Sequence, residues 1–156
     1  MHAFISSRLG YCKSLLYGIN DGLLKKLQAV QNAAARVTTK TRKYHITPVL
    51  RELHWLPVRK RIIYKLAVMV YKCLHGLAPP YLAADCVPVT SVASRRHLRA
   101  AASGCLAVTE MKTTLGRRNF AVTGATIWNN LPADLQLHSQ SLLSFRQKLK
   151  QYLFEP

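Results

Sequence analysis

The sequence predicts a mainly α-helical fold, and three observations support that class. Apolar residues recur at helical spacing in several segments, capping residues precede these segments, and proline or glycine follows them. The 156 residues suffice for one ordinary domain, and their 49% hydrophobic and 19% charged content is not that of a disordered chain. We expect a helical bundle-like module over residues 1–85, a basic and poorly ordered or partly extended linker over 86–116, and short C-terminal helices over 117–156.

The first expected helix covers residues 21–39. Its apolar residues recur at alternating spacings of four and three, which predicts one stripe that packs on neighbouring helices. The stripe consists of Leu23, Leu27, Val30, Ala34 and Val37. Either Asn20 or Asp21 can cap its start through a side-chain oxygen.

Two short helices are expected on either side of a longer one. Thr47 followed by Pro48 is an N-cap and first-turn signal, so a short helix should cover about residues 47–54. After the turn "GLAPPYL", a second short helix is expected over about 81–85.

The long helix is expected over about residues 56–75. Pro57 lacks a backbone N–H and suits its first turn, and Gly76 can supply a left-handed cap at its end. At 100° per residue, its apolar side contains Val58, Ile62, Leu66, Met69, Val70 and Cys73. A second stripe contains the cations Arg61, Lys65 and Lys72. We expect the corner formed by Trp55 and Pro57 to set the direction of this cationic stripe.

The C-terminal part contains two further periodic segments. A helix is expected over about 117–131, ended by Pro132, with an inward face of Phe120, Gly124, Ile127, Trp128 and Leu131. Ser139 or Ser141 should cap a last helix, with Leu142, Phe145, Leu149 and Tyr152 inward and Arg146, Lys148 and Lys150 mostly outward. Before them, "CLAVTEMKTTLG" alternates weakly and is expected to be extended.

The charge of the chain is strongly unbalanced. It has 23 Lys and Arg against 6 Asp and Glu, a net charge of +17. The first 78 residues carry 14 of the cations and 2 of the acids. Self-repulsion on this scale destabilises a compact state unless an anion binds, and nucleic acid is the commonest such partner. We expect the N-terminal half to face a polyanion, with an acidic membrane surface as the second choice.

The cysteines do not indicate a disulfide framework or a metal site. Cys12, Cys73, Cys86 and Cys105 lie far apart without a CxxC pair, which favours reduced thiols. A zinc site would need Cys73, His75 and Cys86 to converge with a fourth ligand, so we expect no metal and no cofactor. No segment is long and apolar enough for a membrane span, and "MHAFISSRLGYCK" is a poor signal peptide. We expect a nuclear or cytoplasmic, non-secreted protein.

No catalytic constellation is visible, so we do not expect an enzyme from this chain alone. The six acids are isolated from one another, whereas two-metal nucleotidyl transfer needs closely placed carboxylates. The sequence has no GxxxxGK[ST] loop, no HExxH motif and no GxSxG elbow, and its six histidines are dispersed without a base–nucleophile partner.

The basic residues are the candidate site. The run Arg59–Lys60–Arg61 opens a helix, where the helix dipole disfavours cations, so stability alone does not explain it. A second cluster is "TKTRKYH". The predicted phosphate contacts are Lys40, Arg42, Lys43, Arg59, Lys60, Arg61, Lys65 and Lys72. Trp55 and Pro57 are expected to position them, and Trp128 to pack in the core.

Five blocks together resemble a known family. In order they are "SRLGYCKSLLYG", "LQAVQNAAARV", "ITPVLRELHWLPVRKRIIYKLAVMVYKCLHGLAPPYL", "RRNFAVTGATIWNNLPADL" and "SLLSFRQKLKQYLF". They are similar to the C-terminal region of reverse transcriptases from non-LTR (LINE-type) retrotransposons of the chicken-repeat/jockey group. One departure is Gly10, where the family usually has Asp in "SRLDYC".

The resemblance implies a thumb and post-thumb region that grips a template–primer duplex. The catalytic aspartates and the primer grip of that family lie upstream of this region, next to a polymerase palm. The opening of the sequence resembles the interior of a longer reading frame. Thumb contacts go to phosphates and carry no sequence specificity, and an RNA–DNA hybrid is near A-form, with a major groove that side chains read poorly.

We therefore expect a non-catalytic fragment of a LINE-type RNA-directed DNA polymerase that binds RNA or a template–primer hybrid. Two alternatives remain. Apolar helix faces that would pack on the palm could instead mediate binding to another protein or self-association. The chain could also be a non-functional remnant of a decayed retroelement.

Overall fold

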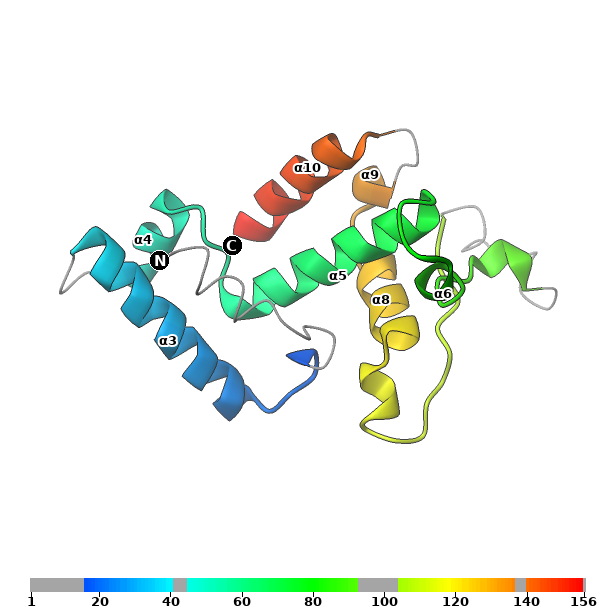
Figure 1. The fold of residues 1–156 in the computed structure, drawn as a ribbon, viewed down its shortest axis with the longest axis horizontal. Coiled ribbons are helices and arrows are strands. Elements are labelled where there is room, and N and C mark those ends of the chain that lie inside the picture. Colours follow the sequence, from blue (N-terminus) through cyan, green and yellow to red (C-terminus); the bar gives the residue numbers. More distant parts are fainter. Residues whose placement is uncertain (1–15, 41–44, 93–103, 137–139, 156) are drawn as a thin grey trace.

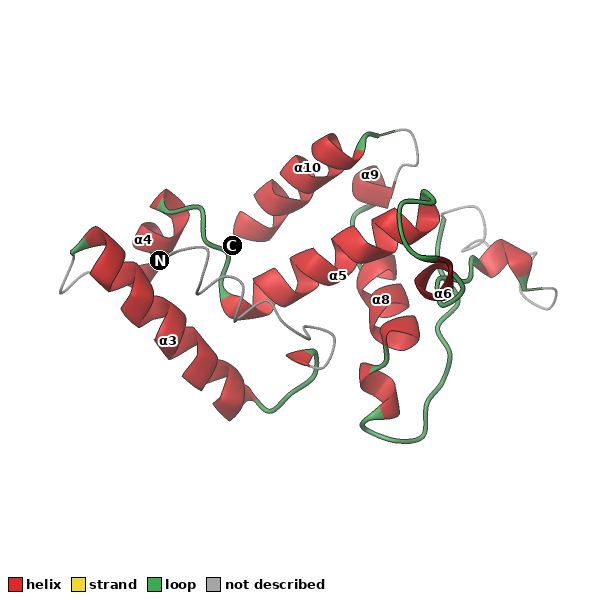
Figure 2. Cartoon of the chain, in the orientation of Figure 1, coloured by secondary structure: helices red, strands yellow, loops and turns green. Residues whose placement is uncertain are grey.

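The computed structural model describes residues 16–40, 45–92, 104–136 and 140–155. It confirms the mainly α fold class, because these residues form helices and turns and no β-strand (Figure 2). The segment expected to be extended around residue 106 forms one isolated antiparallel bridge, between Pro88 and Leu106, and no named strand among the described residues. None of the described helices is both long enough and apolar enough to cross a membrane.

Helix α5, Val58–Leu74, is the centre of the fold. It contacts α3 (Asp21–Thr39), α6 (Pro80–Ala83), α8 (Phe120–Asn129) and α10 (Leu142–Phe154), as Figure 1 shows. Its buried residues are Val58, Ile62, Leu66, Ala67, Val70, Tyr71 and Cys73. The predicted apolar side is correct except for Met69, which is 37% exposed, because the buried face is centred closer to Ala67 and Tyr71.

The start of α5 differs slightly from the prediction. Pro57 is the N-cap with ψ of 151°, so it precedes the first turn instead of lying in it. The end of the helix agrees, because Gly76 has φ of +67°. The Leu77 N–H donates to the Lys72 carbonyl at 2.8 Å, as in a Schellman motif.

The same motif ends α4, Ile46–Glu52, without a glycine. His54 takes the left-handed conformation with φ of 54°, and the Trp55 N–H donates to the Leu50 carbonyl at 2.7 Å. This reversal directs the chain from α4 into the Trp55–Leu56–Pro57 corner. The two neighbours at the corner enter different clusters: Leu56 joins the main core, and Trp55 joins a small one.

The small cluster lies between α3 and α4. Its buried members are Ala34, Ala35, Val49, Leu50 and Trp55. The predicted stripe on α3 is wrong in part, because Leu23, Val30 and Val37 are exposed by 53, 57 and 63%. Small Ala34 and Ala35 form the face that meets α4, and this rotates the three larger residues toward solvent.

Two glutamines of α3 hold the corner and explain that rotation. Gln31 is 1% exposed, and its side-chain N–H donates to the Leu56 carbonyl at 2.9 Å. The Gln28 side-chain oxygen accepts from the Val58 N–H at 2.8 Å, which caps α5 where its own N-cap residue supplies no side-chain bond. Both glutamines must face α5, so the exposed residues Leu23, Val30 and Val37 cannot face it as well.

The C-terminal helices complete the main core. Ser141 caps α10 by accepting from the Ser144 N–H, as one of the two predicted caps. Phe145 is fully buried and stacks on Tyr71 with ring centroids 4.5 Å apart. Tyr152 is 40% exposed and Leu153 is buried in its place, which corrects the predicted inward face by one residue.

The helix expected over 117–131 is shorter than predicted. A 3-10 turn, η3 (Gly116–Arg118), precedes α8, and α9 (Ala133–Gln136) follows Pro132. The predicted inward residues of α8 are buried or half-buried. The Asn129 side chain accepts from the Leu106 N–H and donates to the Leu106 carbonyl, both at 2.8 Å. One side chain thus satisfies both backbone groups of Leu106, which a neighbouring strand would otherwise have to do.

Candidate nucleic-acid interface

The three consecutive cations at the start of α5 point in three directions. Successive residues of a helix are rotated by about 100°, so a run of three covers most of its circumference. Arg59 faces α3, Lys60 faces the end of α10, and Arg61 faces the side where α5 and α10 run together. The run predicted as one surface therefore divides among three surroundings.

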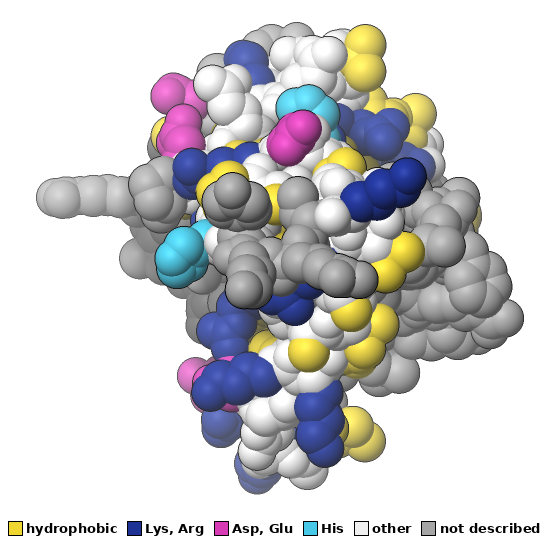
Figure 3. All heavy atoms as spheres, turned by 90° about the vertical axis from the view of Figure 1, so that its left-hand side faces the viewer, with side chains coloured by type: hydrophobic (Ala, Val, Ile, Leu, Met, Phe, Trp, Pro, Cys, Tyr) yellow, Lys and Arg dark blue, Asp and Glu magenta, His cyan; other side chains and the backbone are white. Residues whose placement is uncertain are grey.

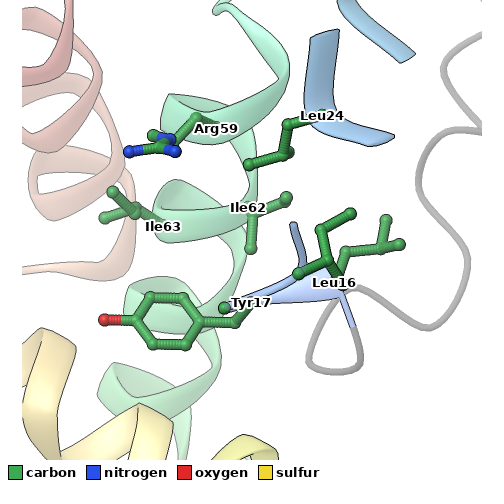
Figure 4. A pocket seen from close by; sticks show the side chains of 8 residues that line it. Leu16, Tyr17, Leu24, Arg59, Ile62 and Ile63 are labelled. Carbon is green, nitrogen blue, oxygen red and sulfur yellow. The ribbon is translucent and has the colours of Figure 1, made fainter. Parts of the chain in front are cut away.

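Arg59 is paired with an acid. Its guanidinium donates to the Asp21 carboxylate in an exposed ion pair, with side chains 66 and 73% exposed. The residue also borders an apolar pocket of about 310 Å³ between α5 and the segment of residues 16–19 that precedes α3, with Leu24 of α3 at its side (Figure 4). Figure 4 shows Leu24, Ile62 and Ile63 around it. This environment makes Arg59 a weaker candidate for a phosphate contact than its position in the run suggested.

Lys60 is engaged with the main chain of α10. Its ammonium donates to the Glu155 carbonyl at 2.7 Å, and the Arg51 guanidinium donates to the Phe154 carbonyl at 3.3 Å. The carboxyl end of a helix carries unsatisfied carbonyls and partial negative charge, which cations stabilise. Lys60 therefore has a structural role that holds α10 beside the corner.

The α5–α10 cleft is the site that the structure assembles. It has a volume of about 220 Å³ and is lined by four cations, Arg61, Lys65, Arg146 and Lys150, with His54, Trp55, Leu56 and Tyr64. Two of these cations come from α5 and two from α10. None of the described residues that line the cleft is acidic.

The electrostatics of the cleft reflect this one-sided charge. Burial lowers the pKa of Lys65 below its ordinary value, and the positive charges of Arg61, Arg146 and Lys72 lower it further. Burial also lowers the pKa of Arg61. A lowered pKa of a cation means that its charged form is destabilised where it stands, and a bound anion would relieve that destabilisation.

Two residues of α10 restrain the cleft. The Arg146 guanidinium donates to the Tyr64 hydroxyl at 3.3 Å, and the Lys150 ammonium lies 5.9 Å from the centre of the Phe154 ring. Neither was among the residues selected from sequence as phosphate contacts. Their spacing of four on the predicted outward face was the available signal, but nothing local indicated that this face adjoins Arg61 and Lys65.

The remaining predicted contacts do not all join the cleft. Lys72 acts on Lys65 electrostatically but does not line the cleft. Lys40 caps the C-terminal end of α3 in a left-handed conformation, and Figure 1 shows that end of α3 pointing away from α5. Arg42 and Lys43 lie outside the described residues. On the face shown in Figure 3, cationic side chains are dispersed among apolar and acidic ones, so the cations do not form one continuous patch there.

Two of the three residues selected as structural, Trp55 and Trp128, are buried, and Pro57 is half-buried. Trp55 is 7% exposed and forms part of the cleft wall, while Pro57 precedes α5. Trp128 is 1% exposed, and its indole N–H donates to the Gly104 carbonyl at 3.2 Å. The burial of both indoles leaves little ring surface for stacking on a base.

The described residues contain no cluster of three or more side chains suited to a metal ion. Cys73 and Cys86 are buried near each other, and their thiols share a hydrogen bond. Burial, with the influence of Cys73 and Asp85, raises the pKa of the Cys86 thiol to about 12, which keeps it protonated at neutral pH. Cys12 lies outside the described residues.

Comparison of the chain with protein-family models, with curated proteins and with solved structures found no match. The functional interpretation therefore depends on the residues themselves.

Proposed function

We propose that this chain is the thumb-like C-terminal part of a LINE-type reverse transcriptase and binds RNA or an RNA–DNA hybrid through its phosphates, without catalysis of its own. The family part of the proposal depends on the five ordered sequence blocks. The binding part depends on one observation: the α5–α10 cleft is lined by four cations, and none of the described residues that line it is acidic.

The chemistry of the cleft favours the backbone of a nucleic acid over its bases. Arginine and lysine donate to phosphate oxygens, and such contacts fix position without sequence information. Asn and Gln, which read adenine through a paired donor and acceptor, are not among the described residues that line the cleft; its two arginines can donate to guanine as well as to phosphate. We therefore expect similar affinities for different sequences of equal length.

Salt dependence is the direct test of phosphate contact. If Arg61, Lys65, Lys72, Arg146 and Lys150 each neutralise one phosphate, the logarithm of the association constant should fall with the logarithm of salt with a slope of about −3.5 to −4.5. Filter binding of an RNA duplex and an RNA–DNA hybrid from low to moderate salt measures it. A slope near zero would contradict the proposal.

A matched pair of variants separates the cleft from the general charge of the protein. The cleft variant replaces Arg61, Lys65, Arg146 and Lys150 by Gln. The control replaces four exposed cations outside the cleft by Gln: Lys25, Lys26, Lys112 and Lys148. Both lose four charges, so equal losses of affinity would indicate a diffuse field, whereas we expect the cleft variant to lose at least about tenfold more.

A second candidate function is supported by the outward ridge of α3, which consists of Leu23, Val30 and Val37. Their side chains are each more than half exposed and are spaced by seven residues, so they lie along one line of the helix. Exposed apolar residues in a row are typical of a surface that binds another protein or a second copy.

Light scattering with and without an RNA duplex distinguishes the two functions. A monomer that binds RNA supports the nucleic-acid proposal, and an oligomer indifferent to RNA supports self-association. Replacing the three ridge residues by Gln should dissolve such an oligomer. The exposed pair Leu77 and Leu115, changed in the same way, is the control.

A further inference from the structure

The size of the α5–α10 cleft limits what it can hold. Pockets for drug-sized ligands span about 300–1,000 Å³. The cleft has about 220 Å³, so it suits a small group such as one phosphate with part of its sugar. A continuous duplex would pass over its mouth, with at most one backbone phosphate inside the cleft and the neighbouring phosphates contacting the cations from its rim.

The charge of the cleft exceeds what one backbone phosphate supplies. A phosphodiester carries one negative charge, whereas a phosphate monoester carries about 1.5 to 2 at neutral pH. Four cations line the cleft, and none of the described residues that line it is acidic. A monoester therefore matches this site better than a diester does.

The walls of the cleft favour a strong interaction with a compact anion. Trp55 and Leu56 are only 7 and 6% exposed and form apolar wall, which reduces screening by water. The Arg146 guanidinium is restrained by the Tyr64 hydroxyl, and a planar guanidinium donates in pairs to phosphate oxygens. The cations stand on two facing helices, so a ligand between them is contacted from both sides.

We propose that the α5–α10 cleft binds a terminal phosphate monoester of a nucleic-acid strand, held by Arg61 and Lys65 of α5 and by Arg146 and Lys150 of α10. The proposal rests on the proposed function, because the strand that carries the phosphate is a nucleic acid. It adds that strand ends are preferred over internal positions. The same chemistry would accept free phosphate, so the test must separate the two sources.

The experiment compares strands of one sequence that differ at their ends. One carries a 5′-phosphate, one a 3′-phosphate, and one hydroxyls at both ends. The charge control is a hydroxyl-ended strand that is two nucleotides longer, because its added negative charge lies in internal phosphodiesters. Fluorescence anisotropy at fixed salt should show about tenfold tighter binding of at least one phosphorylated strand than of the longer hydroxyl strand.

Variants locate the preference in the cleft. The double change Arg146→Gln and Lys150→Gln should reduce the tenfold ratio to near one. The double change Lys25→Gln and Lys26→Gln, on exposed cations of α3, should preserve it. Thermal melts of both variants verify that the fold is kept. A ratio that survives the α10 changes would overturn the proposal.

The outcomes separate this inference from the proposed function. Equal binding of phosphorylated and longer hydroxyl strands would overturn the terminal-phosphate site while leaving nucleic-acid binding intact. Failure of every strand to bind would contradict the proposed function itself. Calorimetric titration with inorganic phosphate should give binding at least tenfold weaker than that of the phosphorylated strand. Equal affinity would identify free phosphate as the ligand and would also overturn the proposal.

Discussion

The two flanks of α5 contain the same kinds of side chain in different surroundings. On the α3 flank, Arg59 meets the carboxylate of Asp21, and two glutamines tie the helices together. On the α10 flank, Arg61 meets Lys65 and Arg146 with no described acid beside them. Two arginines separated by one residue thus differ in their surroundings: a carboxylate pairs with Arg59, and cations surround Arg61 in the cleft. Which cations of a basic protein are available to an anion depends on the neighbouring helix, and the total charge does not reveal it.

The first prediction removes the packing that creates the α10 flank. Phe145→Ala deletes a fully buried ring that stacks on Tyr71 and lies 6.0 Å from the Trp128 ring. We expect the free energy of unfolding to fall by about 3–5 kcal/mol. Denaturant titration measures it, with exposed Leu143→Ala as a control that should change it by less than about 0.5 kcal/mol.

The second prediction breaks the α3 flank. Gln31→Ala leaves the Leu56 carbonyl without its side-chain donor in a buried position. We expect a loss of about 1–3 kcal/mol in the free energy of unfolding. The exposed Gln147→Ala is the control and should be close to neutral. A neutral Gln31→Ala would show that α3 is placed by its apolar contacts alone.

The third prediction uses pH to distinguish the flanks. The pKa of Lys65 lies below its ordinary value, so Lys65 loses its charge at a lower pH than an unperturbed lysine. An anion binds the protonated form, so affinity should fall as pH rises through that lowered pKa, and the salt slope should shrink by about 0.7–0.9. Anisotropy with an adenine-only DNA strand, whose charge is constant over this range, measures the fall. A Lys65→Gln variant should start weaker and decline less; an equal decline would assign the effect to other groups.

The last prediction concerns the paired arginine and has the smallest expected effect. Asp21→Asn releases Arg59 from an exposed ion pair, so the free energy of unfolding should change by less than about 1 kcal/mol. Affinity for an RNA duplex should rise by about two- to threefold, because one more cation becomes available. The control, Glu110→Gln, changes the net charge by the same amount at an exposed site elsewhere and should raise the affinity for the RNA duplex less.

Features that depend on neighbouring residues could be predicted from the sequence. The bounds of α3, the Ser141 cap of α10 and the left-handed Gly76 follow from local capping rules, and the structure has all three. His54 has the same conformation as Gly76 without the residue type that would indicate it. The cationic stripe of Arg61, Lys65 and Lys72 was visible because helical periodicity is itself local.

Features that depend on distant partners could not be predicted. The buried face of α3 is decided by acceptors and donors at Leu56 and Val58, 25 and 30 residues along the chain. The apolar periodicity of α3 is equally consistent with the wrong face. Likewise, Arg146 lines the cleft only because α10 packs beside α5. Its hydrogen bond to Tyr64 joins residues that are 82 positions apart in the sequence.

The peptide bond between Trp55 and Leu56 joins two separate apolar clusters. The cluster beneath Trp55 is the smaller one, so α4 and the end of α3 should open more readily than α5 and α8 in native-state hydrogen exchange. Each such opening would displace the indole that forms one wall of the α5–α10 cleft. Binding of a strand would then slow amide exchange in α4, although this helix contributes no cation to the cleft. A bound anion would thereby make α4 more rigid.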